Sequence, residues 1–277
     1  MHRPFTQVDV FTDTPLLGNP LAVVHDAQGL SDAQMQAFAR WTNLSETTFL
    51  LPPTEAAADY RIRIFTPHRE LPFAGHPTLG SCHAWLEAGG VPRAAGKVVQ
   101  QCAAGLISLR RGGERLAFAA PPCLRNGPLA PDLLARITAA LSLRPAEILD
   151  HQWVDNGPGW SAIRLASAEA VLALRPDWPA LRDIKLGVVG PHRVGCDAQF
   201  EVRALIGEGS GYEDPVTGSL NASLAQWLIA DGVAPEAYVA AQGTCLARHG
   251  RVYIERVDGQ VWVGGASVSC IRGEVAL

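Results

Sequence analysis

The stretch Ala84-Trp85-Leu86-Glu87-Ala88-Gly89-Gly90-Val91 returns in altered form as Gln226-Trp227-Leu228-Ile229-Ala230-Asp231-Gly232-Val233. Each stretch closes a run of small and apolar residues, and each run stops at glycine, a common helix terminator. The two runs predict helices over Thr78–Ala88 and Ser219–Ala230. Helices that are apolar on every side are typical of a helix enclosed by a curved sheet rather than one lying on a surface.

The segments around these helices come in the same order twice. An apolar, strand-like run precedes each helix, at Tyr60–Phe65 and at Ala198–Ile206. After each helix, two strand-like runs flank a turn dipeptide, Gly112-Gly113 in the first case and Asp258-Gly259 in the second. A strand, a helix and a hairpin that recur in one order predict a duplicated domain.

Composition narrows the class of protein. The chain has 277 residues, a net charge of -4 and no basic stripe, which argues against nucleic acid or an anionic membrane as partner. Residues 1–18 lack the apolar core of a signal peptide, so we expect a cytoplasmic protein. The six cysteines are scattered and form no Cys-x-x-Cys pair, so we expect reduced thiols and no structural zinc.

The start of each predicted helix is a candidate anion-binding site. Carboxylates and a glycine precede each helix, with Gly75 in the first junction and Asp214 and Gly218 in the second. Free backbone N–H groups and the helix dipole favour a bound anion at such a place. Each junction taken alone also fits ordinary loop and capping chemistry.

Glu46 and His76 are the candidate acid–base groups. Glu46 stands at the start of an apolar run, Thr47–Leu51, where lost hydration would raise the pKa of its carboxyl and suit it to carry a proton. His76 lies between Gly75 and Pro77, which predicts a loop position from which it contacts the substrate or that carboxylate. Taken alone, Glu46 also fits a solvated residue at a strand start.

The chain resembles the phenazine-biosynthesis PhzF-like isomerases. The resemblance rests on four motifs in the family's order over nearly the whole chain, Val8–Phe11 with Gly18–Val23, Leu44–Thr47, Phe65–Pro67 with Glu70–Gly80, and Glu213–Ser219. It implies an α+β, diaminopimelate-epimerase-like fold of two pseudo-symmetric domains, each a curved, mostly antiparallel sheet or barrel around a central helix. We expect residues 1–120 with about 266–277 to form the first domain and residues 121–265 the second, with the active site in the cleft between them.

The resemblance also implies a role for each matching residue. Glu46 corresponds to the carboxylate that shuttles the proton. Other site residues are His76 and Asp214, which act on the substrate, and Gly75, Gly218 and Ser219, which bind it. The family's name-giving member isomerises trans-2,3-dihydro-3-hydroxyanthranilate. The expected partner is therefore a small anionic metabolite; no metal or organic cofactor is implied, and a homodimer is expected.

Two alternatives stay open at this point, and a third is disfavoured. An epimerase, tautomerase or lyase of the same fold would use the same Glu46 on another acidic metabolite. A non-catalytic small-ligand binding protein would bind without turnover. A two-thiol racemase is disfavoured, because neither helix start carries a cysteine.

Overall fold

The computed structural model describes residues 1–113 and 115–277. The chain divides into two compact units. Unit 1 comprises Met1–Ala119 and Gly264–Leu277, and unit 2 comprises Ala120–Val263. Each unit carries a largely antiparallel sheet and a helix that is apolar on most sides, so the α+β class predicted from the sequence is confirmed.

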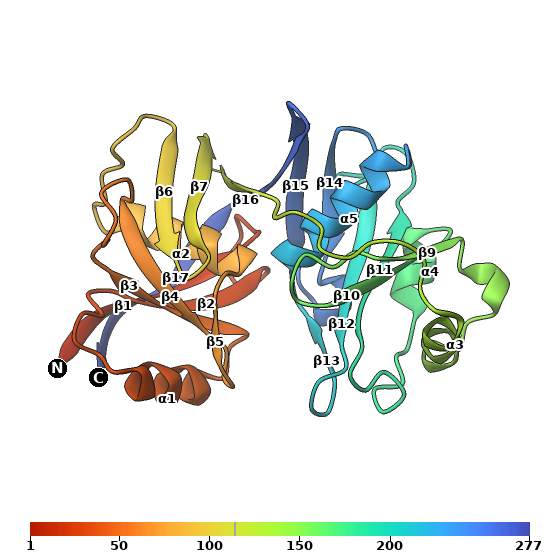
Figure 1. The fold of residues 1–277 in the computed structure, drawn as a ribbon, viewed down its shortest axis with the longest axis horizontal. Helices are drawn as coiled ribbons and strands as arrows, with labels where there is room; N and C mark the ends of the chain where they lie inside the picture. The colour runs from red at the N-terminus through yellow and green to blue at the C-terminus, as the bar shows by residue number, and fades with distance from the viewer. Residues whose placement is uncertain (114) are drawn as a thin grey trace. The chain divides into compact units, whose positions relative to one another are not determined.

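The described residues of unit 1 form two helices, the first eight strands and the last strand (Figure 1). The helices are α1 (Asp32–Thr42) and α2 (Gly75–Glu87). The strands are β1 (His2–Val10), β2 (Asn19–Val24), β3 (Glu46–Leu51), β4 (Tyr60–Phe65), β5 (Glu70–Leu71), β6 (Lys97–Cys102), β7 (Gly105–Gly112), β8 (Arg115–Ala119) and β17 (Ser267–Ala276).

Unit 2 holds the remaining elements. Its helices are α3 (Pro131–Ala140), α4 (Ala168–Ala173) and α5 (Gly218–Ala230), with short 3₁₀ turns at Pro145–Glu147 and Thr244–Leu246. Its strands are β9 (Asp150–Trp153), β10 (Trp160–Arg164), β11 (Lys185–Pro191), β12 (Phe200–Ile206), β13 (Tyr212–Asp214), β14 (Ala237–Gln242), β15 (Gly250–Val257) and β16 (Gln260–Gly265), whose last two residues belong to unit 1.

The strand pairings of the two units repeat each other. In unit 1, β2 runs parallel to β3, β4 runs antiparallel to β3 and β5, and β6 runs parallel to β4 and antiparallel to β7. In unit 2, β10, β11, β12, β13, β14 and β15 follow the same sequence of parallel and antiparallel pairs. The duplication expected from the sequence is therefore a duplication of topology.

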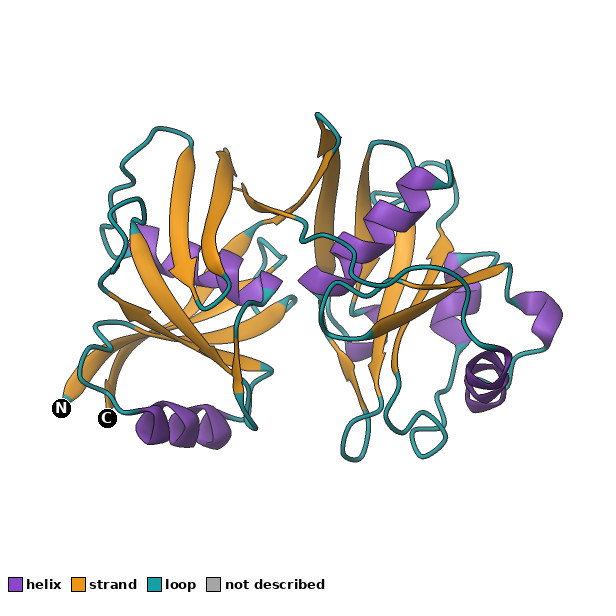
Figure 2. Ribbon diagram, in the orientation of Figure 1, coloured by secondary structure: helices purple, strands orange, loops and turns teal. Residues whose placement is uncertain are grey.

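Helices α2 and α5 are each buried against the sheet of their own unit. Helix α2 contacts β1, β2, β3, β6, β8 and β17, and Figure 2 shows strands on both sides of it. The approach is close, because a Cβ on Gly80 would lie 2.6 Å from a methyl group of Leu21. Helix α5 is equally apolar, and in unit 2 the sheet supplies the glycine, since a Cβ on Gly187 would lie 2.5 Å from a methyl group of Leu220.

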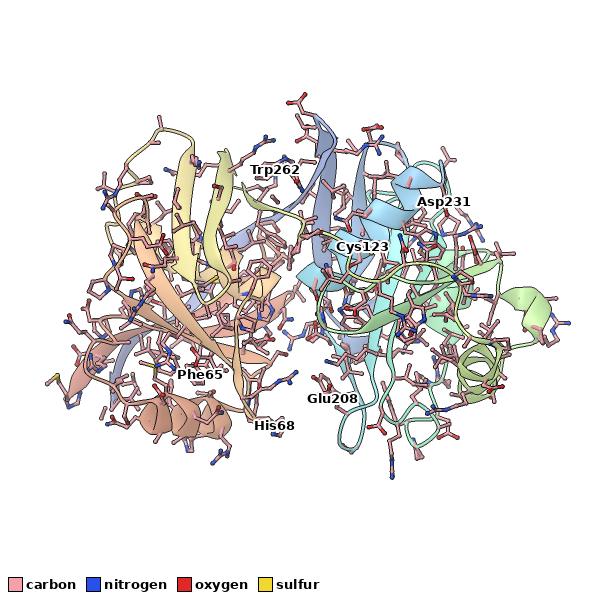
Figure 3. All side chains as sticks on the ribbon, viewed as in Figure 1. Phe65, His68, Cys123, Glu208, Asp231 and Trp262 are labelled. Carbon is pink, nitrogen blue, oxygen red and sulfur yellow. The ribbon has the colours of Figure 1, made fainter. Side chains whose placement is uncertain are left out.

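Outer layers cover the other face of each sheet. In unit 1, α1 begins with a capping box at Ser31 and packs Met35 and Phe38 against the sheet. Figure 3 shows Phe65 among these side chains, where its ring meets Phe49 edge-on at 5.5 Å. In unit 2, α3 and α4 form the corresponding layer over β10, β11 and β12.

Three details refine the predicted elements. Helix α2 begins at Gly75, three residues before the predicted start. The turn between β15 and β16 has positive φ at both Asp258 and Gly259, as a type I′ hairpin turn requires. The predicted turn after Gly112 joins β7 to β8, but Glu114 lies outside the described residues.

None of the described helices has the length and hydropathy that a membrane-crossing helix requires.

Candidate active site

The candidate site residues of unit 1 lie at the N-terminal turn of α2 and beside it. Gly75 is its first helical residue and His76 the second, so the loop position predicted for His76 is wrong. The physical reason is Pro77, which sits in the first turn, where no backbone N–H donor is needed within the helix. In the described chain no side chain caps this turn, and its first backbone N–H groups stay available to an anion.

His76 lies against Glu46, the first residue of β3. The imidazole Nδ1 is 3.4 Å from Glu46 Oε2, and the two side chains are 5% and 16% exposed. Burial lowers the pKa of His76 to about 3, so the ring is neutral near pH 7. A neutral ring has one N–H donor and one acceptor nitrogen. Its Nε2 has no hydrogen-bond partner among the described residues and faces a buried setting.

Hydroxyl groups fix the strand that carries Glu46. The Thr47 and Thr42 hydroxyls lie 3.0 Å apart, which ties the start of β3 to the end of α1. On the next residue, the Thr48 hydroxyl accepts a hydrogen bond from Ser81 in α2 at 2.8 Å. These contacts hold β3 against both helices, so the Glu46–His76 distance is set by the packed sheet rather than by a free loop.

The candidate site residues of unit 2 lie at the N-terminal turn of α5 and beside it. Asp214 ends β13 and is 7% exposed. Its carboxylate accepts a hydrogen bond of 2.5 Å from the hydroxyl of Thr217, the residue that precedes the helix. Gly218 and Ser219 are the first and second helical residues, which places Ser219 at the position that His76 holds in α2.

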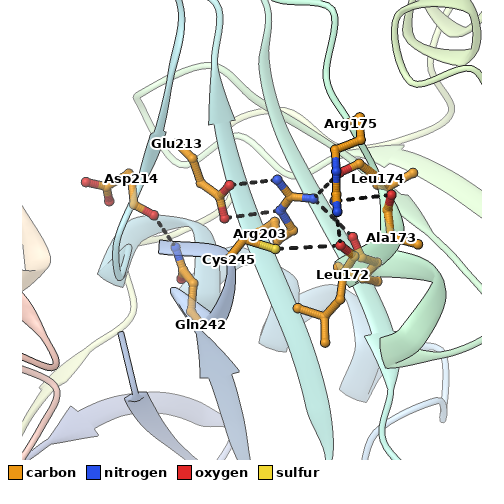
Figure 4. A network of polar contacts seen from close by, with 10 residues as sticks. Leu172, Ala173, Leu174, Arg175, Arg203, Glu213, Asp214, Gln242 and Cys245 are labelled. Carbon is orange, nitrogen blue, oxygen red and sulfur yellow. Dashed lines mark hydrogen bonds and ion pairs between the residues drawn. The ribbon is translucent and has the colours of Figure 1, made fainter. Parts of the chain in front are cut away.

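A buried amide, Gln242, organises the start of α5 in unit 2. Its Nε2 donates to the backbone oxygen of Asp214 at 3.1 Å and to the Thr217 hydroxyl at 3.0 Å. Its Oε1 accepts from the Thr217 backbone N–H at 3.0 Å and from Asn221 Nδ2 at 2.8 Å. Figure 4 shows the contact between Gln242 and Asp214. Asp214 and the start of α5 are thus locked to the end of β14.

The strand under Asp214 is anchored from its other face. Glu213 accepts two hydrogen bonds from Arg203, at 3.1 and 2.7 Å, and both side chains are 5% exposed (Figure 4). Arg203 also donates to the backbone oxygens of Val171 and Leu174 at the end of α4. Because successive residues of a strand point to opposite faces, this ion pair fixes β13 while Asp214 faces the start of α5.

Most of the framework residues that the sequence analysis missed carry no local sequence signal. The predicted residues Glu46 and His76 meet in unit 1, and Asp214, Gly218 and Ser219 gather in unit 2. Thr217, Asn221, Gln242 and the indole donor to Ser219, Trp160, were not anticipated. Only Thr217 could have been suspected, as a threonine directly before a helix.

Other candidate groups lie elsewhere. Among the described residues, no group of three or more His, Cys, Asp or Glu side chains could hold a metal ion. Unit 1 has a cavity of about 510 Å³ at the far end of α2, lined in part by Tyr60 and Trp85, and another of about 490 Å³ beside Glu87. Neither is lined by Glu46 or His76.

Comparison with known proteins places these features in a family. Residues 8–273 match the family described as phenazine biosynthesis-like protein. The chain is 34% identical to trans-2,3-dihydro-3-hydroxyanthranilate isomerase of Pseudomonas aeruginosa, covering 98% of this chain and 95% of that protein. It is 36% identical to antisense-enhancing sequence 1 of Schizosaccharomyces pombe, covering 98% and 97%.

A solved structure agrees over the whole chain. A phenazine biosynthesis protein of the PhzF family from Enterococcus faecalis superposes with a TM-score of 0.83 at 27% identity, covering 100% of both chains. The pseudo-symmetric fold implied by the sequence resemblance is thereby confirmed.

Proposed function

Because the chain belongs to the phenazine biosynthesis-like (PhzF-like) protein family, we propose that this isomerase moves a proton between two carbons of a small carboxylate metabolite, with Glu46 as general acid and base. The observation that carries the proposal is the Glu46–His76 contact of 3.4 Å beside an uncapped helix start. A carboxyl group that is 16% exposed exchanges protons with a bound substrate rather than with bulk water.

The chemistry needs only proton movement. The Glu46 carboxylate takes a proton from one carbon, and the electron pair of that C–H bond enters the adjacent unsaturated system. The protonated Glu46 then returns the proton to a second carbon, so no atom or electron is gained or lost. Neutral His76 can hold the carboxyl or a substrate group by a hydrogen bond without competing for the proton, because burial lowers the pKa of its ring to about 3. We therefore propose a reaction without a cofactor.

The substrate carboxylate is assigned to the helix ends. Neither α2 nor α5 has a side-chain cap in the described chain, and no acidic residue lies in the first turn of either helix. We propose that the backbone N–H groups at Gly75 and Gly218 bind the carboxylate, and that Asp214 and Ser219 bind the same substrate on which Glu46 acts. The first substrate to test is trans-2,3-dihydro-3-hydroxyanthranilate, after the named relative from Pseudomonas aeruginosa.

The decisive experiment follows the proton. The protein and its Glu46→Gln variant are incubated with trans-2,3-dihydro-3-hydroxyanthranilate in deuterated water, and the ring carbons are followed by proton NMR. We expect turnover with deuterium incorporation in the wild type and a loss of about 10²- to 10⁴-fold in the variant. Glu55→Gln is the matched control, because Glu55 is an exposed glutamate of unit 1 outside the site.

The other outcomes separate the alternatives. Exchange at carbon without the isomerised product would indicate an epimerase or tautomerase, and release of a fragment would indicate a lyase. Ligand binding that is equal in wild type and Glu46→Gln, with neither exchange nor turnover, would indicate a binding protein and overturn the proposal.

Two further proposals concern the protein in the cell. We propose that it works in the cytoplasm, supported by the six cysteines, which are all unpaired thiols. We propose a homodimer on the family resemblance. Sedimentation equilibrium of the purified protein decides between one chain of 29.5 kDa and two.

A further inference from the structure

Ser219 in the first turn of α5 has a hydroxyl group whose direction is fixed. The indole N–H of Trp160 donates to Ser219 Oγ at 3.0 Å, and Trp160 is only 2% exposed. An indole nitrogen can only donate, so Ser219 Oγ must accept this bond. The hydroxyl hydrogen is then left for another acceptor, and none of the described residues supplies one. Ser219 therefore presents a hydrogen-bond donor at the predicted anion site.

Asn156 presents the opposite polarity beside it. Its Nδ2 donates to the backbone oxygen of Ser219 at 3.0 Å. A backbone oxygen can only accept, so the amide orientation is fixed and Oδ1 must point away from that contact. This oxygen is buried, and no residue of the described chain donates to it. Buried acceptors without a donor are rare, because they lose their hydration without compensation.

The loop that carries Asn156 is held in place. Asp155 Oδ1 accepts hydrogen bonds from the backbone N–H groups of Gly157 and Gly159, at 2.8 and 2.6 Å. The backbone of Asp155 exchanges hydrogen bonds with Arg125, at 3.1 and 3.0 Å. Gly157 and Gly159 both have positive φ, which suits glycine in such a turn. The unpaired Oδ1 is therefore a feature of a fixed turn rather than of a loose loop.

We propose that Asn156 determines substrate specificity, by accepting a hydrogen bond from an amino or hydroxyl group of the substrate while Ser219, set by Trp160, donates to the substrate carboxylate. The inference rests on the proposed function and narrows it. The substrate class becomes small carboxylates that carry an N–H or O–H donor near the carboxylate. Asn156 and Trp160 act through hydrogen bonds to substrate and to Ser219, and neither takes part in proton transfer.

The test uses four benzoates that carry both, one or neither of an amino group and a hydroxyl group. They are 3-hydroxyanthranilate, 3-hydroxybenzoate, anthranilate and benzoate, and their binding is measured by calorimetry to wild type and to Asn156→Ala. We expect deletion of the recognised donor to weaken wild-type binding by about tenfold or more, since it leaves the buried acceptor unpaired. In Asn156→Ala that difference between ligands should vanish. A purely structural effect of the substitution would weaken all four ligands alike.

Trp160→Phe is the second variant, because it removes the indole donor to Ser219 and keeps a smaller aromatic ring in its place. It should weaken all four benzoates by a similar factor and leave the difference between ligands intact, since every ligand has the carboxylate. Equal binding of all four ligands to the wild type, no binding of any, or an unchanged ligand difference in Asn156→Ala would each overturn the inference.

The inference and the proposed function can fail separately. If the benzoates follow the expected pattern but Glu46→Gln leaves deuterium exchange unchanged, the proton-transfer assignment fails and Asn156 recognition stands. If exchange depends on Glu46 but Asn156→Ala does not alter ligand preference, the reverse holds.

Discussion

The same ion pair occurs once in each unit, and its surroundings differ. In unit 1, Arg63 on β4 donates from Nε and Nη2 to the two carboxylate oxygens of Glu70 on β5, at 2.7 and 2.6 Å. In unit 2, Arg203 on β12 makes the same two contacts with Glu213 on β13. The first pair is 23% and 35% exposed, and the second is 5% and 5% exposed. The duplicated ion pair is therefore partly exposed to solvent in unit 1 and buried in unit 2.

The candidate site residues also differ between the two units. The strand and helix of unit 1 carry Glu46 and His76, which meet at 3.4 Å, and Glu46 is the group proposed to exchange a proton with the substrate. The strand and helix of unit 2 carry Asp214, whose carboxylate and backbone are both held by hydrogen bonds. We infer that the duplicated halves have divided the work, with proton transfer in the first and rigid binding in the second.

The largest expected effect tests the two ion pairs. Arg203→Met leaves Glu213 charged and buried without its partner, so we expect unfolding to become easier by about 3–5 kcal/mol. Arg63→Met should cost less than about 1 kcal/mol, because solvent screens the charges that remain. Urea unfolding of both variants measures the difference. Equal losses would mean that burial does not distinguish the pairs, and that the two units do not differ as described.

A smaller effect is expected from the two buried glutamine amides. Gln242→Leu removes the partners of Thr217, Asn221 and the Asp214 backbone, and we expect a loss of about 2–4 kcal/mol. It should also raise KM, since the start of α5 loses its support. Gln100 in unit 1 is equally buried, and its amide joins Tyr60 and Thr78.

Gln100→Leu is the matched control for that substitution. It should cost about 1–2 kcal/mol and raise KM less than Gln242→Leu, since Gln100 reaches the start of α2 only through the Thr78 side chain, whereas Gln242 also holds backbone groups at the start of α5. Thermal melting and steady-state kinetics on the same preparations give both quantities. A rise in KM in Gln100→Leu as large as that in Gln242→Leu would remove the claim that only the second half depends on a rigid amide.

The repeated helices and strands could be predicted from the sequence, whereas the hydrogen bonds between distant residues could not. The two helices, their glycine stops and the order of strands were readable, because periodicity and turn residues are local signals. His76 was placed on a loop because Pro77 looked like a boundary, although proline is tolerated in a first helical turn.

The hydrogen-bond framework could not be predicted from the sequence, for a different reason. Gln242 stands 25 residues from Thr217, and Asn156 stands 63 residues from Ser219. Nothing in the local sequence marks a glutamine or an asparagine as the partner of a distant backbone group. The roles of such residues can be identified only in the folded protein, where the sheet brings them to the start of a helix.

The smallest expected effect is that of the titration of His76. The equivalent residue in unit 2 is Ser219, whose hydroxyl group does not titrate in this pH range. Burial lowers the pKa of His76 from 6.5 to about 3, so between these values the unfolded chain binds a proton that the folded chain does not. The free energy of unfolding should therefore fall as the pH drops below 6.5, by up to about 1.4 kcal/mol per pH unit. His76→Gln should remove this part of the slope, whereas His68→Gln, at an exposed histidine, and Ser219→Ala should keep it. Urea midpoints at pH 7.0, 6.0 and 5.0 (chosen above about pH 4, where many carboxylates titrate) measure the slope. If His76→Gln keeps the wild-type slope, His76 takes up its proton in the folded state, and the neutral ring on which the proton-transfer assignment of unit 1 relies is wrong.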